Sequence, residues 1–399
     1  MTRLPSSLAR VRSWSALSIA LLVPTSILQA RCGSEAASTP DGDASSGDSS
    51  NNGDASPDSS SVSDAPANTD APLVVGDAGA TDWAYMQVPG TQCGNGSVAG
   101  FAHSLVPGSK KTLIYFVGGG ACWNTFTCKV ADNGKGTAAH INENYTEATF
   151  KSELPLLQAS GFFDRDANSP FKDANMFVVP YCTGDLHAGD AIQAYNPINN
   201  AEKTYHKGGT NVDKFIPEFQ KLATGSTQIW ISGSSAGGYG AQLNFDRLSI
   251  AYPGAKTDLL ADCAQAVTPV EWGTWQAMWK PTFPATCTDC KTSFPALIPD
   301  LAKRYPGSNI GLLDYESDDV LLKFFYGLIS DPALIRNATN SLLDNQYTSP
   351  NTRYFHLKGT KHVMLGEYKT LTHTSGVTLK QWIGDWSTHA PAWANQRQL

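Results

Sequence analysis

The stretch "QIWISGSSAGGYGAQ", at residues 228–242, joins alternating apolar residues to a cluster of serines and glycines. Its pattern Gly-x-Ser-x-Gly, at 233–237, is typical of a turn that exposes a nucleophilic serine between a strand and a helix. Small residues are needed there because the strand and the helix almost touch. A flexible loop would also explain the glycines, but a β-rich segment precedes the motif and a helical segment, 239–249, follows it. We therefore expect Ser235 to be a nucleophile.

A serine nucleophile needs backbone N–H groups that hold the negative oxygen formed when it attacks a carbonyl. One such group comes from the residue after the serine, here Ala236, and another from a glycine-rich loop after an earlier strand. The loop "GGGACWNTFTC" follows the apolar segment 112–117 and contains Gly119 and Gly120. A flexible turn is the alternative reading. We expect Gly119, Gly120 and Ala236 to form an oxyanion hole.

A base and an acid complete this chemistry, in the chain order serine, acid, histidine. The base that we expect is His362, which follows a glycine turn after the last apolar segment. The loop "DYESDDVLLKFF" lies between the serine and the histidine, and we prefer Asp318 to Asp319 as the acid. Either aspartate would also suit the N-cap of the apolar helix that we predict over 320–325.

Aromatic residues gather in the segment "VEWGTWQAMWKPTFP", after the apolar segment 257–260. Ordinary core packing would explain them, but they would also suit a lid or platform for sugar rings or acyl chains. We expect Trp272 and Trp275 to bind substrate, and His187, in "YCTGDLHAGD", to line the same entrance.

The elements that must position these residues lie between 81 and 399, where short apolar segments alternate with helical ones. This alternation predicts one α/β domain with a mostly parallel central sheet and helices on both faces. In such sheets functional groups gather in the loops after the carboxyl ends of the strands. The predicted strands are 112–117, 175–180, 227–232, 257–260, 309–313 and 353–357.

The first part of the chain has a different character. Residues 1–32 place arginines before a short apolar stretch, which predicts an export signal. Cys32 resembles a lipoprotein cleavage site except for Arg31 before it, so a lipid anchor remains an alternative. Residues 33–80 hold nine acidic residues, no basic residue and few large apolar ones, which predicts a disordered linker. We expect a secreted or cell-surface protein.

Charge and cysteine content narrow the class of partner. Residues 81–399 are nearly neutral, so we expect no nucleic-acid surface, and we expect a monomer that needs no cofactor. Eight cysteines in an exported chain favour disulfides. Cys122 and Cys128, six residues apart, would close a loop that stiffens the oxyanion donors. Cys287-x-x-Cys290 has no second such pair, so we expect no metal site.

Five motifs together resemble the pectin acetylesterase and Notum family of α/β-hydrolases. They are "CGNGS" at Cys93, "GGGACWN" at Gly118, "YCTGD" at Tyr181, "GSSAGG" at Gly233 and "GTKH" at Gly359. The resemblance implies an α/β-hydrolase fold and a serine carboxylesterase that uses Ser235, an acid and His362. It also implies a Cys93–Cys182 disulfide beside Cys122–Cys128. The pairing of Cys263, Cys287 and Cys290 stays open.

The substrate depends on loops that differ from the family pattern. Ala121 stands where the plant enzymes have tryptophan, and Val363-Met364 replaces their Cys-Gln. Loops carry specificity while the scaffold carries the reacting groups. We expect hydrolysis of a short acyl ester, acetyl on a polysaccharide such as pectin. The alternatives are a lipase or protein deacylase for longer chains and, less favoured, a non-catalytic binding module.

Overall fold

The computed structural model describes residues 82–195, 201–327 and 330–398. The expected export signal at 1–32, including Cys32, and the expected linker at 33–80 lie outside these ranges. None of the helices in the described ranges combines the length and the apolar character needed to cross a membrane.

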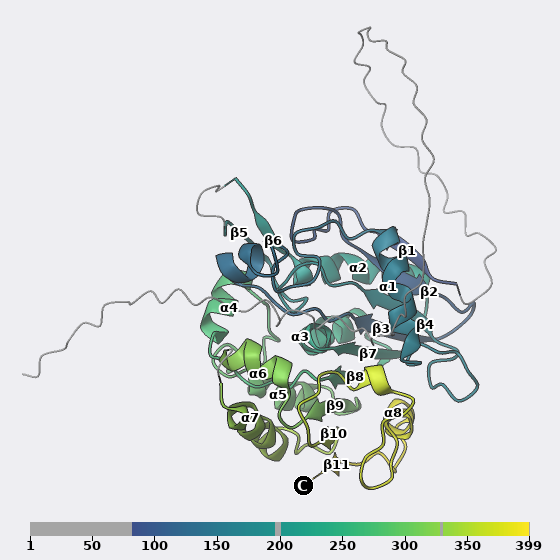
Figure 1. The fold of residues 1–399 in the computed structure, drawn as a ribbon. Helices are drawn as coiled ribbons and strands as arrows, with labels where there is room; N and C mark the ends of the chain where they lie inside the picture. Colours follow the sequence, from purple (N-terminus) through teal and green to yellow (C-terminus); the bar gives the residue numbers. More distant parts are fainter. Residues whose placement is uncertain (1–81, 196–200, 328–329, 399) are drawn as a thin grey trace, which may run out of the picture. The chain divides into compact units, whose positions relative to one another are not determined.

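A nine-stranded sheet forms the centre of the described domain (Figure 1), in the order β1-β2-β4-β3-β7-β8-β9-β10-β11. β1 and β2 pair antiparallel with each other, and β2 pairs antiparallel with β4. In the spatial order of this sheet, every neighbouring pair from β4 through β3, β7, β8, β9 and β10 to β11 is parallel. The predicted mostly parallel sheet is therefore confirmed. The strands are β1 (Ala84–Gln87), β2 (Gly100–Ser104), β3 (Lys111–Phe116), β4 (Asn175–Val179), β7 (Gln228–Ser234), β8 (Lys256–Asp262), β9 (Ile310–Tyr315), β10 (Thr352–Leu357) and β11 (Gln396–Arg397), with a separate antiparallel pair β5 (Ala191–Gln193) and β6 (Thr204–His206).

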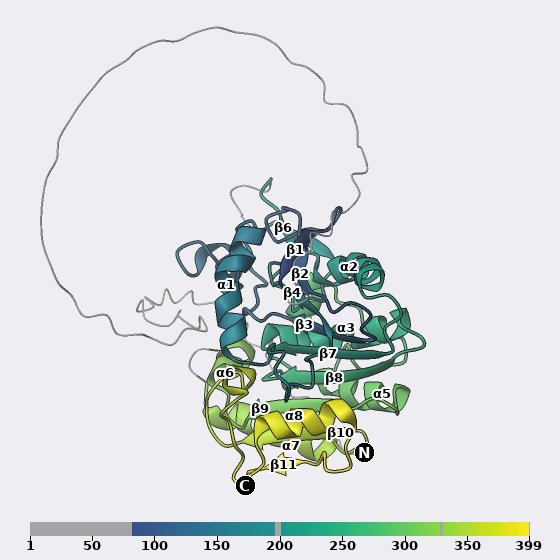
Figure 2. The same cartoon turned by 90° about the vertical axis from the view of Figure 1, so that its right-hand side faces the viewer.

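Helices cover both faces of this sheet, as predicted. α3 packs against β3, β7 and β8 on one face. Figure 2 shows α8 on the other face, in front of β9 and β10, where Trp230 Nε1 of β7 donates to the Ser387 carbonyl at 3.3 Å. The α-helices are α1 (Glu147–Ala159), α2 (Gly208–Leu222), α3 (Ala236–Ala251), α4 (Trp272–Trp279), α5 (Leu297–Arg304), α6 (Asp319–Tyr326), α7 (Pro332–Asn345) and α8 (Leu379–Thr388), and the short turns are η1 (Phe126–Val130), η2 (Phe294–Ala296) and η3 (Leu365–Glu367).

The central strands are buried along almost their whole length, which is expected for parallel strands covered on both sides. Their carboxyl ends meet at one edge of the sheet, where the loops after β3, β7, β9 and β10 carry the residues that the sequence singles out. β8 differs from its predicted range, because it continues past Leu260 to Asp262 and so brings a carboxylate to the same edge.

Candidate active site

Ser235 lies in a tight turn between β7 and α3, with β7 ending at Ser234 and α3 beginning at Ala236. Its backbone has φ 57° and ψ −127°, a conformation that residues other than glycine seldom adopt. The turn depends on small neighbours, because a Cβ on Gly237 would collide with the carbonyl oxygen of Phe116 on β3. The residue types at this motif therefore bring a partly exposed serine to the carboxyl edge of the sheet.

The glycine-rich loop after β3 lies directly against this turn. A Cβ on Gly118 would stand 3.0 Å from Ser235 Cβ, and Gly120 has φ +78°, which favours glycine. The Gly119 carbonyl accepts from Ala139 N–H at 2.8 Å, which fixes the loop. In the ranges that the structure describes, the N–H groups of Gly119, Gly120 and Ala236 donate to no acceptor. The Ala236 group also stands at the positive end of the α3 dipole.

Asp318 contacts His362 and caps a helix with separate oxygens. His362 Nδ1 lies 2.7 Å from Asp318 Oδ2. Asp318 Oδ1 accepts from the N–H groups of the first turn of α6, those of Val320 and Leu321, at 3.0 Å each. The two sequence-based readings of this residue, acid and N-cap, are therefore compatible. Asp318 is fully buried, whereas Asp319 is partly exposed and pairs with Lys323 at 3.0 Å.

The second nitrogen of His362, Nε2, has no hydrogen-bond partner among residues of the described ranges. With Nδ1–H donated to the Asp318 carboxylate, Nε2 carries a free lone pair. This is the arrangement that a general base requires.

A second aspartate–histidine pair lies inside the sheet, where His356 Nδ1 contacts Asp314 Oδ1 at 2.6 Å. The two residues are register partners on β10 and β9, and both are almost completely buried. His356 is thus enclosed within the sheet and is not exposed to solvent.

The structure buries the side chains of the three residues that were expected to contact substrate. His187 is 2% exposed, lies between Phe116 and Tyr181, and has Nε2 at 2.9 Å from the Val117 carbonyl. Burial lowers the pKa of His187 to about 4, so the ring is neutral. Its Nε2–H donates to the Val117 carbonyl, which directly precedes the glycine-rich loop.

Trp272 and Trp275 do not form an open platform either. Both belong to α4 and are buried, Trp272 at 5% exposure and Trp275 at 1%. Trp272 stacks on Phe294 at 4.7 Å between ring centroids, and Trp275 packs on Trp279 at 4.8 Å. The core-packing reading of this segment is therefore the correct one.

Partly exposed aromatic rings lie near the glycine-rich loop instead. Trp123 follows Cys122 in that loop, and its ring packs 5.0 Å from the ring of Trp275. Phe324 of α6 approaches from the other side, so that a Cβ on Gly120 would stand 3.2 Å from its Cζ atom. The sequence alone did not identify Phe324, because the place of this ring depends on the direction in which α6 runs after its N-cap, Asp318.

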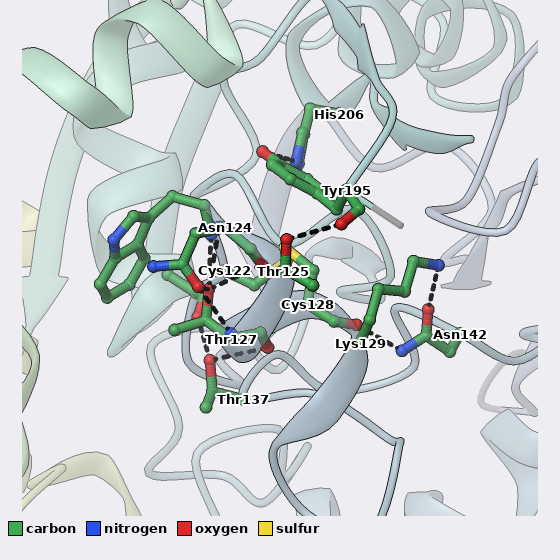
Figure 3. The surroundings of a disulfide bond; sticks show 12 residues. Cys122, Asn124, Thr125, Thr127, Cys128, Lys129, Thr137, Asn142, Tyr195 and His206 are labelled. Carbon is green, nitrogen blue, oxygen red and sulfur yellow. Dashed lines mark hydrogen bonds between the residues drawn. A yellow bond between two sulfur atoms is a disulfide. The ribbon is translucent and has the colours of Figure 1, made fainter. Parts of the chain in front are cut away.

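Disulfides join Cys122 to Cys128 and Cys93 to Cys182. Figure 3 shows the first of these, with the Thr125 hydroxyl donating to the Tyr195 carbonyl at 2.6 Å and Asn142 Nδ2 donating to the Cys128 carbonyl at 2.6 Å. These contacts hold the segment after the glycine-rich loop at several points. The pairing that the sequence left open is Cys287 with Cys290, and Cys263 is a buried free thiol.

Among the residues that the structure describes, two groups of side chains have the atom types of metal ligands within 4.8 Å of one another. The sulfurs of Cys122 and Cys128 lie near His206, but these sulfurs are bonded to each other. Cys263 lies near Asp318 and His362, which already contact each other. Burial, followed by the charges of Asp262 and Asp318, raises the pKa of the Cys263 thiol well above its ordinary value, so the neutral thiol is favoured.

The strand order, the turn at Ser235 and the helices on both faces define an α/β-hydrolase. The crystal structure of the Wnt deacylase Notum from Drosophila shares this fold, with a TM-score of 0.54 and 16% identity over 79% of this chain and 96% of that chain. The family model described as Pectinacetylesterase matches residues 82–265 of this chain.

The chain is also similar to curated carboxylesterases. Palmitoleoyl-protein carboxylesterase NOTUM of Mus musculus is 26% identical over 176 residues, which are 43% of this chain and 33% of that protein. Its counterpart in Schmidtea mediterranea is 29% identical over 165 residues, 39% of this chain and 28% of that protein. The alignments thus span about a third of the length of these relatives.

Proposed function

We propose that this protein is an exported serine carboxylesterase that releases short acyl groups from carbohydrate esters. The observation that carries the proposal is that Ser235, the Asp318–His362 pair and three N–H groups with no acceptor in the described ranges all lie just after carboxyl ends of strands at one edge of the sheet. Three disulfides in the described domain favour an oxidising compartment, which supports export.

The reaction is acyl transfer in two steps. His362 Nε2 takes the proton of Ser235 as its oxygen attacks the ester carbonyl, while Asp318 holds the imidazole through Nδ1. The N–H groups of Gly119, Gly120 and Ala236 stabilise the oxyanion, and the alcohol leaves with a proton from His362. Water, activated by His362, then releases the acid from the acyl-enzyme.

Two features support a short acyl group on a carbohydrate. The ring of Phe324 approaches Gly120 closely and narrows the space beside the oxyanion loop. The family is named for the removal of acetyl groups from pectin. The buried Trp272 and Trp275 no longer support sugar stacking, which leaves Trp123 as the partly exposed aromatic ring in that loop.

A second candidate is a deacylase for long acyl chains. It is favoured by the matched relatives, which are palmitoleoyl-protein carboxylesterases. The two candidates share the reacting groups and differ in the space available to the acyl chain.

A series of nitrophenyl esters of increasing chain length separates these candidates. Each methylene buried in an acyl pocket contributes about 0.8 kcal/mol, so a long pocket makes kcat/KM rise steeply from acetyl to octanoyl. We expect the highest kcat/KM with acetyl or propionyl esters and a fall beyond them. An optimum at eight or more carbons would replace the short-chain proposal with the deacylase.

Phe324→Ala tests the structural reason for this preference. Removal of the ring opens space beside Gly120, so the optimum is expected to move to longer esters while the acetyl ester is still hydrolysed. Phe126→Ala is the matched control, because Phe126 is 55% exposed on η1. If the wild type, Phe324→Ala and Phe126→Ala all show the same dependence of kcat/KM on chain length, Phe324 does not limit the length of the acyl group.

The Cys122–Cys128 disulfide is expected to support the oxyanion donors. Serine at both positions removes a crosslink worth roughly 2 kcal/mol for so short a loop and loosens the segment after Gly120. We expect kcat for an acetyl ester to fall about tenfold with a smaller change in KM. The control is the double serine variant of Cys287 and Cys290. An equal effect of both double variants on kcat would contradict a specific role.

A further inference from the structure

Asp262, at the end of β8, is a completely buried carboxylate beside the proposed site. The Ser234 hydroxyl donates to its Oδ2 at 2.6 Å, and the Tyr115 hydroxyl in turn donates to Ser234 Oγ at 2.8 Å. Ser234 and Asp262 are register partners on β7 and β8. The Asp262 backbone carbonyl also accepts from Ser235 N–H at 2.8 Å. Asp262 therefore fixes the turn that carries Ser235.

The same carboxylate holds the loop that carries His362. Met364 N–H donates to Oδ1 at 2.8 Å, and Leu365 N–H donates to Oδ2 at 3.1 Å. Between His362 and these amides lies Val363, whose φ of 64° is unusual for a β-branched residue. Two hydrogen bonds to a buried carboxylate stabilise this strained turn. Asp262 is thus the common anchor of the serine turn and the histidine loop.

The contacts favour the ionised form of this group. All three hydrogen bonds to the Asp262 side chain are donated to it, two of them by backbone N–H groups that cannot accept a proton in return. Burial is the largest influence and raises the pKa of Asp262 above its ordinary value overall, although the hydrogen bonds from Ser234, Met364 and Leu365 and the charge of His362 act in the opposite direction. The titratable groups around it are Tyr115 on β3, Cys263 after β8, Tyr315 on β9, Asp318 after β9, and His362.

We infer that Asp262 is a positioning residue for the proposed esterase reaction. It holds Ser235 and His362 in fixed positions relative to each other and places a second negative charge beside the imidazole. This inference rests on the proposed function. The charge of Asp262 stabilises the imidazolium that forms when His362 takes the serine proton. Asp318 orients the ring directly, and Asp262 acts through the backbone that follows it, at Met364 and Leu365.

Asp262→Asn tests this role. Three donors point at the Asp262 carboxylate, but an asparagine amide has only one oxygen to accept them. At least one of the donors therefore faces the NH₂ group, and the negative charge is lost. We expect kcat for an acetyl ester to fall about 100-fold, with KM changed less than about threefold. We also expect the acid limb of the kcat/KM profile to move to lower pH by about half a unit or more, because the imidazolium loses a neighbouring charge.

Asp258→Asn is the matched control, because Asp258 lies on the same strand, is also fully buried, and bonds Gln228, Asn309 and His389, none of which belongs to the proposed site. It is expected to lower the free energy of unfolding without moving the pH profile. If Asp262→Asn does no more to kcat and to the acid limb than Asp258→Asn, the positioning role is wrong.

Hydrogen exchange of the wild-type protein tests the anchor should the variant fail to fold. The amides of Met364 and Leu365 are expected to exchange slowly, because they are buried and bonded to Asp262. Exchange as fast as that of the amide of Lys361, an exposed residue in the same loop, would overturn the inference. The proposed function fails separately, if the wild-type protein hydrolyses no ester.

Discussion

Ser235→Ala should abolish ester hydrolysis and leave the fold intact, with kcat lower by about 10⁴ to 10⁶. Ser235 supplies the only hydroxyl at the tip of the turn, and alanine fits there because the turn already excludes larger side chains. The measurement is the initial rate with an acetyl ester, with circular dichroism as the test of folding.

Ser234→Ala is the matched control for this experiment. The Ser234 hydroxyl is buried and points to Asp262 rather than to the substrate side, so its loss is expected to cost no more than about tenfold in kcat. Comparable losses in the two variants would mean that the nucleophile has been assigned to the wrong serine.

Asp318→Asn has the second largest expected effect, a fall in kcat of about 10⁴. The amide keeps an oxygen for the N–H groups of Val320 and Leu321, so the α6 cap and the stability are preserved. Its NH₂ group then faces His362 Nδ1 and favours the wrong tautomer of the ring. The activity is measured together with the melting temperature, so that a loss of the cap is not mistaken for a loss of catalysis.

Asp319→Asn provides the comparison on the neighbouring residue. Asp319 makes a surface ion pair with Lys323, which contributes little, so activity should stay close to that of the wild type. The reverse order of the two variants would transfer the role of acid to Asp319.

The parts of this molecule that were predictable from the sequence have strong local signals. Central parallel strands are continuous apolar runs, so six of them were found near their observed ranges. The turn at Ser235 is readable because close backbone contacts demand glycine at fixed positions. The N-cap at Asp318 is also a local property of one loop.

The parts that were missed depend on contacts between distant segments. Whether Trp275 faces solvent or core is decided by its packing against Trp279 and Phe325, which the local sequence does not contain. His187 was misplaced for the same reason, since its partner Val117 lies 70 residues away. Asp262 was overlooked because the predicted strand stopped two residues short of it. Burial of polar and aromatic side chains is a tertiary property.

Covalent labelling by a fluorophosphonate tests the central claim most directly. An activated serine next to an oxyanion hole attacks the phosphorus, whereas an ordinary serine does not react. Mass spectrometry of the intact wild-type protein is expected to show one adduct, and peptide mapping should place it on Ser235 within residues 228–242. An unlabelled wild-type protein, or the same adduct in the Ser235→Ala variant, would contradict the account.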